Sequence, residues 1–510
     1  MTNAFSLFKS LIIYGICLPL AIFVGYLLAT PEDLTTYGAL GLLLVLMSVP
    51  LFLRFHYPWL IFCWNSSAGL YFLPGRPSFC LMMIFISFGF SFLAYVMNRD
   101  LKFISVPWVA RPLLLFAGVV IGTAYFTGGI GLNALGSEVS GGKRYIFLLS
   151  GVVGYFALTA VRIPVRKAAL YVNLFFIGFV ITAIGNILYL LSPALYFLAY
   201  LFPQDAATNT GLIETGSGIT RLGSLATACV GIVYLLLARY GIIGILDVRK
   251  AWRILLVIAL AVTSLFGGYR SKVIELAAAF AVLFYFEGLF RSRLLPAVLL
   301  AGVLGLALVL PFASKLPLTV QRSLTFLPLK LDVEAELNAQ ASTDWRLAIW
   351  SEVLPTVPQY LLMGKGLAMD MRDLEMMRSA SFNRGPDSTS GAGATLAGDY
   401  HNGPLSIIIP FGLGGTITFL WFLGAGFRAL QLNNRYGNPD FARYNRFLLA
   451  YFIVKVLMFM FVFGSLYSDV VFFTGPVGLS IALNGGVLGP ALQPAARPAM
   501  SRFKLANAAR

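Results

Sequence analysis

The residue with the most distinctive chemical setting is His401, one of two histidines in a chain of 510 residues. It lies in Gly398-Asp-Tyr-His-Asn-Gly-Pro404, at the end of a long polar stretch and directly before an apolar run. An imidazole titrates near neutral pH, so it could accept a proton from a substrate hydroxyl as a general base. Asn402 could orient that substrate or cap the following helix. A structural role for His401 at a membrane boundary stays open.

Three arginines could bind phosphate in the same reaction. Arg221 lies in Thr220-Arg-Leu-Gly223, Arg270 lies in Phe266-Gly-Gly-Tyr-Arg-Ser-Lys272, and Arg346 belongs to the long polar stretch. A guanidinium remains protonated and binds phosphate oxygens through paired N–H groups. Such fixed cations stabilise the negative charge that develops on a pyrophosphate leaving group. Alternatively, an arginine at a helix end simply reaches towards lipid headgroups.

Residue types offer little for a metal site. Glu32 and Asp33 share a very short connecting segment, and no histidine–carboxylate cluster stands in the other polar segments. Lys455, Glu275 and Glu287 lie in or near apolar runs, where ionisable residues are functional candidates by default. We therefore predict a site without metal or cofactor.

The elements that position these residues are apolar helices. Hydrophobic residues make up 59% of the sequence, charged residues 11%, and the mean hydropathy is +0.83. A soluble domain cannot bury that much apolar surface, and apolar runs of about 18 residues indicate transmembrane helices. We predict an all-α polytopic bundle, a single integral membrane domain over 1–510. The expected spans, about fourteen, are 10–29, 38–54, 58–73, 79–97, 108–127, 145–162, 169–191, 221–240, 253–267, 272–290, 294–312, 404–424, 447–467 and 470–487.

The distribution of lysine and arginine predicts the orientation, because these residues concentrate in cytoplasmic loops. They collect in alternate connecting segments, which predicts that both termini are cytoplasmic and that 313–403 forms a long outer loop. The three arginines named above then lie on the side that is normally poor in arginine, which favours a catalytic role. The net charge of +16 is explained by this topology and not by nucleic-acid binding. Residues 488–510 are expected to form a short basic cytoplasmic tail.

The long loop is expected to carry amphipathic helices. Between Asp344 and Pro355, aromatic and apolar residues recur at helical spacing, and Thr343 or Asp344 suits the N-cap. Gly364-Lys-Gly366 marks the end of that helix, and Met369–Arg378 could form a second one. Pro404 suits the first turn of the next span.

These motifs, in this order, resemble the signature of the O-antigen ligase and polymerase superfamily. The resemblance covers 220–425. It is carried by Trp345-Arg-Leu-Ala-Ile-Trp350, Gly364-Lys-Gly366, Tyr400-His-Asn-Gly403 and Phe411-Gly-Leu-Gly-Gly415, with Gly267-Gly-Tyr-Arg-Ser271 similar to the family's Ser-Arg-Gly turn. The turn ends in Ser-Lys here, and Ile409-Pro410 replaces an acidic residue often found before the glycine pair.

The resemblance implies an inverting, metal-independent glycosyltransferase in the bacterial inner membrane with its active face in the periplasm. It would transfer an undecaprenyl-pyrophosphate-linked glycan to lipid A-core or to another lipid-linked glycan, with membrane lipids around it. By position, His401 would activate the acceptor hydroxyl, and Arg221 and Arg270 would hold the pyrophosphate. Substrate-binding roles would fall to Arg346, Asn402, Trp350, Lys272 and Tyr400.

Other functions remain open from the sequence. An O-antigen or exopolysaccharide polymerase of the same superfamily is not separated from a ligase by any residue. A lipid-linked oligosaccharide flippase or other transporter would have as many spans, but transporters usually bind substrate at the membrane midplane between repeats, and no repeat is visible. A carboxylate-dependent lipid-sugar transferase would need a larger acidic first outer loop.

Overall fold

The computed structural model describes residues 54–70, 77–98, 102–131, 141–192, 221–369 and 398–489, together with a few isolated positions. The chain divides into two compact units, Met1–His56 and Tyr57–Arg510, and the second contains nearly all of the described residues. Its described elements are helical, and the extended pairing among them is one isolated bridge between Gly69 and Ser78. The prediction of an all-α protein is confirmed.

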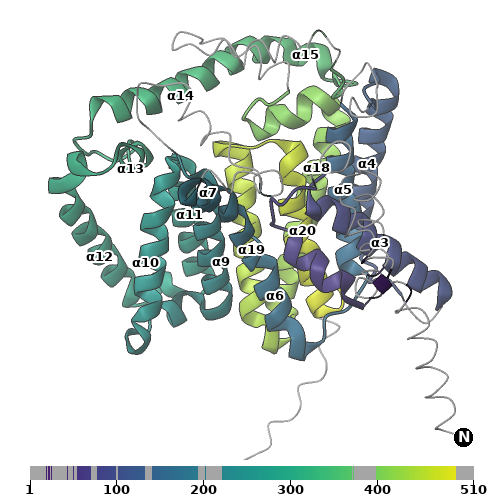
Figure 1. Cartoon of the computed structure of the whole chain (residues 1–510), viewed down its shortest axis with the longest axis horizontal. Helices are drawn as coiled ribbons and strands as arrows, with labels where there is room; N and C mark the ends of the chain where they lie inside the picture. The colour runs from purple at the N-terminus through teal and green to yellow at the C-terminus, as the bar shows by residue number, and fades with distance from the viewer. Residues whose placement is uncertain are drawn as a thin grey trace, which may run out of the picture. The chain divides into compact units, whose positions relative to one another are not determined.

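The described helices of this unit follow one another in a long series (Figure 1). They are α3 (Phe79–Met97), α4 (Pro107–Thr127), α5 (Gly142–Thr159), α6 (Ala168–Ile177), α7 (Val180–Leu191), α9 (Gly223–Ile245), α10 (Trp252–Ser264), α11 (Arg270–Phe286), α12 (Leu294–Val309), α13 (Leu318–Ser323), α14 (Val333–Val353), α15 (Val357–Tyr360), α18 (Gly403–Tyr436), α19 (Ala442–Leu457) and α20 (Leu466–Asn484).

Eight helical segments among the described residues are long and apolar enough to cross a membrane. The predicted fourteen spans are therefore not confirmed as a count. The predicted spans 10–29 and 38–54 lie almost entirely outside the described residues. Span 58–73 is wrong in its second half, because the helix there ends at Cys63 and a turn follows. The eight segments are 79–97, 107–127, 165–185, 223–245, 294–315, 403–436, 439–462 and 466–484.

Small residues allow the helices of the bundle to approach closely, as is common in membranes. α5 packs against α20, where a Cβ on Gly151 would meet Val470 and one on Gly478 would meet Leu158. α4 packs against α18, and Phe116 of α4 contacts the rings of Phe411 and Phe419. Such contacts fix the position of α18, whose first residue follows His401 and Asn402.

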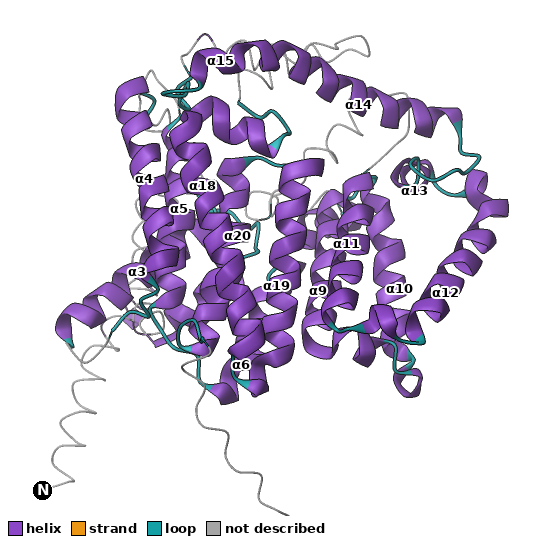
Figure 2. Cartoon of the chain, turned by 180° about the vertical axis from the view of Figure 1, so that it is seen from behind, coloured by secondary structure: helices purple, strands orange, loops and turns teal. Residues whose placement is uncertain are grey.

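α14 lies across one end of the bundle, above the ends of α9, α10 and α11 (Figures 1 and 2). It begins at Val333, where the Asp332 side chain accepts a hydrogen bond from Glu334 N–H as the N-cap. The predicted start at Thr343 or Asp344 is wrong. The first half of α14 contains two glutamates and three alanines and few large apolar residues, so apolar periodicity does not reveal it. The predicted second helix at Met369–Arg378 lies almost wholly outside the described residues.

The segment after α14 is anchored to an interruption in α18. Gly412 has φ 59°, and Pro410 lies just before it. At this interruption Lys365 N–H donates to Ile409 O (2.7 Å), and Gly366 N–H donates to Pro410 O (3.0 Å). A Cβ on Gly364 would collide with Pro410 O, so only glycine fits there. The Gly364-Lys-Gly366 motif thus ties the C-terminal end of the α14–α15 segment to the helix that follows His401.

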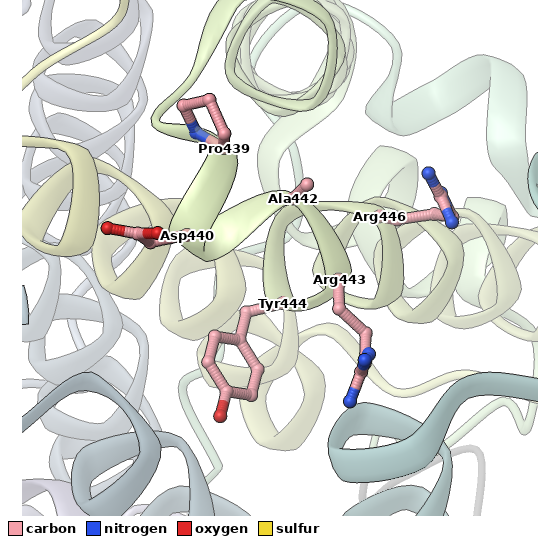
Figure 3. Close-up of a pocket in the computed structure, with 6 residues that line it drawn as sticks. All are labelled: Pro439, Asp440, Ala442, Arg443, Tyr444 and Arg446. Carbon is pink, nitrogen blue, oxygen red and sulfur yellow. The ribbon is translucent and has the colours of Figure 1, made fainter. Parts of the chain in front are cut away.

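The opposite end of the bundle carries the connection between α18 and α19. A shallow pocket there is lined by Pro439, Asp440, Ala442, Arg443, Tyr444 and Arg446. Figure 3 shows the Arg443 and Arg446 side chains pointing away from each other and from Asp440. Arg443 donates to the carbonyl of Arg239 on α9 (2.6 Å). The pocket contains none of the predicted site residues, and its charged groups do not converge on one point.

Candidate active site

Arg221 and Arg322 meet at one residue of α14. Arg221 Nη2 donates to Asn338 Oδ1 (2.9 Å), and Arg322 Nε donates to the same oxygen (2.6 Å). Arg322 also donates to Ser342 Oγ (2.7 Å), one helical turn further along α14, and to the carbonyl of Gly268. Two guanidinium groups that share one amide oxygen must lie close together, although like charges repel.

Arg270 joins this group from the start of α11. Its Nη2 donates to Ala339 O (3.1 Å) and to Thr343 Oγ1 (2.8 Å), both on α14. The turn between α10 and α11 brings it there, because Gly268 adopts a left-handed conformation with φ 67°. A Cβ on Gly268 would lie 3.2 Å from Thr319 of α13 and 3.3 Å from Arg221, so the close approach depends on glycine. The predicted Arg221 and Arg270 are therefore brought to one place.

Arg322 is the site residue that the sequence-based prediction missed. It lies in the short helix α13, and its side chain is buried, with 4% of the residue exposed. Burial, and then the charges of Arg221 and Arg270, lower its pKa to about 9. The available signal was weak: one more arginine in the predicted outer loop, seven residues after Lys315, with no motif around it. Its contacts come from residues up to 54 positions away, which local sequence cannot indicate.

Arg346 continues the row of cations along α14 towards His401. It lies two turns after Asn338, about 12 Å along the helix axis. Burial, and then the charge of Arg270, lower its pKa. Its guanidinium lies 5.9 Å from the centre of the Phe463 ring, and the same ring lies 5.0 Å from the His401 ring. Arg221, Arg270, Arg322 and Arg346, called the arginine cluster below, thus extend to the imidazole.

His401 is held between two aromatic rings. The Trp345 ring lies 5.0 Å away on the α14 side, and the Phe463 ring lies 5.0 Å away just before α20. His401 has φ 47°, a left-handed conformation that no other non-glycine residue of the described chain adopts. Such backbone conformations in non-glycine residues often mark functional sites.

The imidazole is suited to act as a base. Burial lowers the pKa of His401; Asp399 opposes this effect and the charge of Arg346 adds to it. The ring is therefore neutral at pH 7. Its Nε2 lies 3.9 Å from Asp399 Oδ2, and its Nδ1 is buried without a hydrogen-bond partner among the described residues.

The neighbours of His401 hold it in place. Asn402 caps α18, because its Oδ1 accepts a hydrogen bond from Leu405 N–H (3.1 Å). Trp350 Nε1 donates to the carbonyl of Tyr400 (2.9 Å) and so fastens this segment to α14. Tyr400 is buried among Ile349 and other apolar side chains, and burial raises its pKa to about 12. The structure places all three predicted residues beside His401 and gives each a positioning contact.

Lys272 lies at the start of α11 but is engaged in an ion pair. Its Nζ lies 3.0 Å from Glu275 Oε2, and Lys455 Nζ of α19 lies 2.5 Å from Glu275 Oε1. Tyr234 of α9 donates to the same carboxylate (2.8 Å). Glu275, five residues after Arg270 on α11, therefore links α9, α11 and α19 through polar contacts. Glu287 has a different role: it accepts from Ile242 N–H and Ile243 N–H at an interruption in α9.

Residues 255–420 match the sequence model of the O-antigen ligase family. The matched segment makes up about a third of the 510-residue chain. No curated protein matches the chain.

The matched segment contains most of the candidate site. It includes Arg270, Arg322, Arg346 and His401, whereas Arg221 precedes it. The match supports the resemblance seen in the sequence, and the eight long apolar helices agree with a multi-pass membrane protein. Within the described residues, no group of three or more His, Cys, Asp or Glu side chains could hold a metal ion.

Proposed function

We propose that the chain transfers a glycan from undecaprenyl pyrophosphate to an acceptor hydroxyl at the periplasmic face of the inner membrane, by an inverting reaction without a metal. The observation that carries this proposal is the arginine cluster, which runs along one face of α14 to a neutral imidazole. Such a transfer requires cations that stabilise the phosphorylated leaving group and a base that accepts a proton. The arginine cluster and His401 provide both along α14.

The charge of the cluster fits a pyrophosphate. Arg270 and Arg322 donate to neutral amide, carbonyl and hydroxyl oxygens, and the ion pairs of the described residues include neither of them, nor Arg346. Burial, and after it the like charges of neighbouring arginines, lowers the pKa of Arg322 and of Arg346, so positive charge is held in the cluster at a free-energy cost. An anion relieves that repulsion, and the negative charge on a departing pyrophosphate is stabilised most.

The proposed step balances without a co-reactant. His401 takes the proton of the acceptor hydroxyl, and the acceptor oxygen attacks the anomeric carbon from the face opposite the pyrophosphate. The bond between that carbon and the pyrophosphate oxygen breaks, and the electron pair leaves with undecaprenyl pyrophosphate. The arginine cluster stabilises the charge on this product, and the proton on His401 passes to water.

The test is transfer by purified protein in liposomes, with an undecaprenyl-pyrophosphate-linked glycan as donor. His401→Ala is expected to fold and insert normally but to lose about 10²–10⁴-fold in rate, the usual contribution of a general base. Arg270→Lys keeps the charge but loses the planar fork, and is expected to bind the donor markedly less well. Near-normal turnover in the first variant, or unchanged donor affinity in the second, contradicts the assigned role.

Two acceptors in the same assay separate the subfamilies. Lipid A-core as acceptor gives the ligase product, and a second lipid-linked repeat unit gives the polymerase product. A flippase would instead move the intact donor across the bilayer and release no undecaprenyl pyrophosphate. Chelator sensitivity of the transfer would contradict the proposal of a metal-independent reaction.

A further inference from the structure

A second charged group of residues approaches His401 from different helices than the arginine cluster. Arg144 lies in the first turn of α5, with its guanidinium 5.3 Å from the centre of the Tyr467 ring in the first turn of α20. A Cβ on Gly398 would lie 3.6 Å from Arg144 Nη1, so this guanidinium lies against the backbone beside Asp399. Arg144, Asp399 and Tyr467 are called the mixed-charge cluster below.

The mixed-charge cluster and His401 present unused hydrogen-bonding groups. Asp399 Oδ1 and His401 Nδ1 are both buried, and neither has a hydrogen-bond partner among the described residues. Tyr467 lies within the electrostatic range of both Asp399 and Arg144. Buried polar atoms in folded proteins are nearly always hydrogen-bonded, so these two atoms, one on Asp399 and one on the neighbouring imidazole itself, indicate a polar ligand.

The charge of this cluster selects a different ligand from the arginine cluster. It combines one guanidinium with one carboxylate, and the Asp469 carboxylate in α20 lies within range of Asp399. An anion placed here meets like charge, which costs affinity. A sugar ring suits the pair better, because a carboxylate only accepts hydrogen bonds, a guanidinium only donates them, and hydroxyl groups do both.

We propose that Arg144, Asp399 and Tyr467 bind the terminal sugar of the acceptor and present its hydroxyl to His401. This inference rests on the proposed transferase function and assigns the two substrates to opposite sides of the imidazole. The donor pyrophosphate lies along α11, α13 and α14, and the neutral acceptor sugar lies between α5 and α20. Asp399 accepts from a hydroxyl of the ring, and Arg144 donates to a neighbouring oxygen.

The experiment measures the KM values of both substrates in the liposome assay, with whichever of lipid A-core and the lipid-linked repeat unit the unmodified protein glycosylates. Arg144→Gln and Asp399→Asn are expected to raise the KM of the acceptor about 10–100-fold, the usual effect of losing a hydrogen bond to a charged group. The KM of the donor is expected to stay within about twofold in both. Lys143→Gln is the matched control, since it removes the same charge from the adjacent, exposed position.

The outcomes separate the two proposals. An acceptor KM that stays unchanged in Arg144→Gln and Asp399→Asn, or that rises equally in Lys143→Gln, overturns the acceptor site while transfer by the unmodified protein still supports the proposed function. A rise in donor KM as large as that in acceptor KM also overturns it. Absence of transfer to both acceptors by the unmodified protein overturns the proposed function, and the acceptor site with it. Where Arg144→Gln unfolds, Arg144→Lys and Asp399→Asn provide the same comparison.

Discussion

At the scale of single residues, burial and two neighbouring charges of opposite sign determine the pKa of His401. Burial lowers its pKa, Asp399 raises it and Arg346 lowers it. The neutral imidazole is the form that can take a proton, so transfer is expected to fall as pH decreases through the pKa of His401. That pKa lies below its usual value near 6.5, which keeps the base available at neutral pH.

Variants of the two charged neighbours should move the acid limb of the pH profile in opposite directions. Asp399→Asn removes a negative charge that favours the imidazolium, so the pKa of His401 falls and the limb moves to lower pH. Arg346→Gln removes a positive charge, so the limb moves to higher pH. The profile of kcat/KM against pH measures both, and shifts in the same direction would contradict the electrostatic assignment.

Arg322 offers a second test at this scale, because its positive charge in the cluster is unfavourable in free energy. Burial and two neighbouring guanidinium groups lower its pKa to about 9. An anion that neutralises these charges should therefore stabilise the folded protein. Inorganic pyrophosphate at low ionic strength is expected to raise the Tm in detergent, and the increase should shrink with added salt. Arg322→Gln should reduce the increase, and an equal increase in this variant would contradict its place in the cluster.

At the scale of elements, Glu275 links α9, α11 and α19 through Tyr234, Lys272 and Lys455. Its side chain is almost fully buried, so removing the carboxylate leaves Lys455 charged and unpaired. Breaking a buried ion pair in this way costs about 3–5 kcal/mol, whereas replacing both partners with apolar or neutral groups is often nearly neutral.

The expected result is that Glu275→Gln lowers the Tm more than the double variant Glu275→Gln/Lys455→Met does. Because Arg270 opens the helix that carries Glu275, the single variant should also transfer more slowly per folded molecule. Thermal unfolding in detergent and the liposome assay measure the two effects. Equal Tm values for the single variant and the unmodified protein would show that the pair does not hold the helices together.

The sequence indicated these elements unevenly, and the reason is physical. α3, α4 and α9 are predominantly apolar, so hydropathy alone locates them to within about five residues of the structure. The first half of α14 is missed because Glu334, Glu336 and several alanines leave little apolar periodicity. Arg270 and His401 were predicted as site residues because motifs surround them. The hydrogen-bond partners of Arg322 are distant in the sequence. Only the folded chain brings them together, so no local motif indicates this residue.

At the scale of the whole described unit, several helix termini meet at one end. The starts of α5, α9, α11, α18 and α20 lie at this end, together with α14, as hydrogen bonds such as Leu222 N–H to Phe266 O and Leu466 N–H to Ser406 Oγ show. Each of these starts was expected on the outer side from the distribution of lysine and arginine. The structure therefore brings together the ends that the topology prediction assigns to the periplasm.

Labelling of introduced cysteines tests that assignment directly. Leu347→Cys places a thiol on the exposed face of α14, and Val248→Cys places one at an exposed turn beyond α9, at the other end of the bundle. With α14 outside, a thiol reagent that cannot cross the membrane should label Leu347→Cys in intact spheroplasts and Val248→Cys only after lysis. Of the four native cysteines, Cys63, Cys80 and Cys229 are buried and Cys17 lies outside the described residues, so the unmodified chain measures the background labelling. The reverse pattern would place the arginine cluster in the cytoplasm, where a periplasmic transferase cannot work.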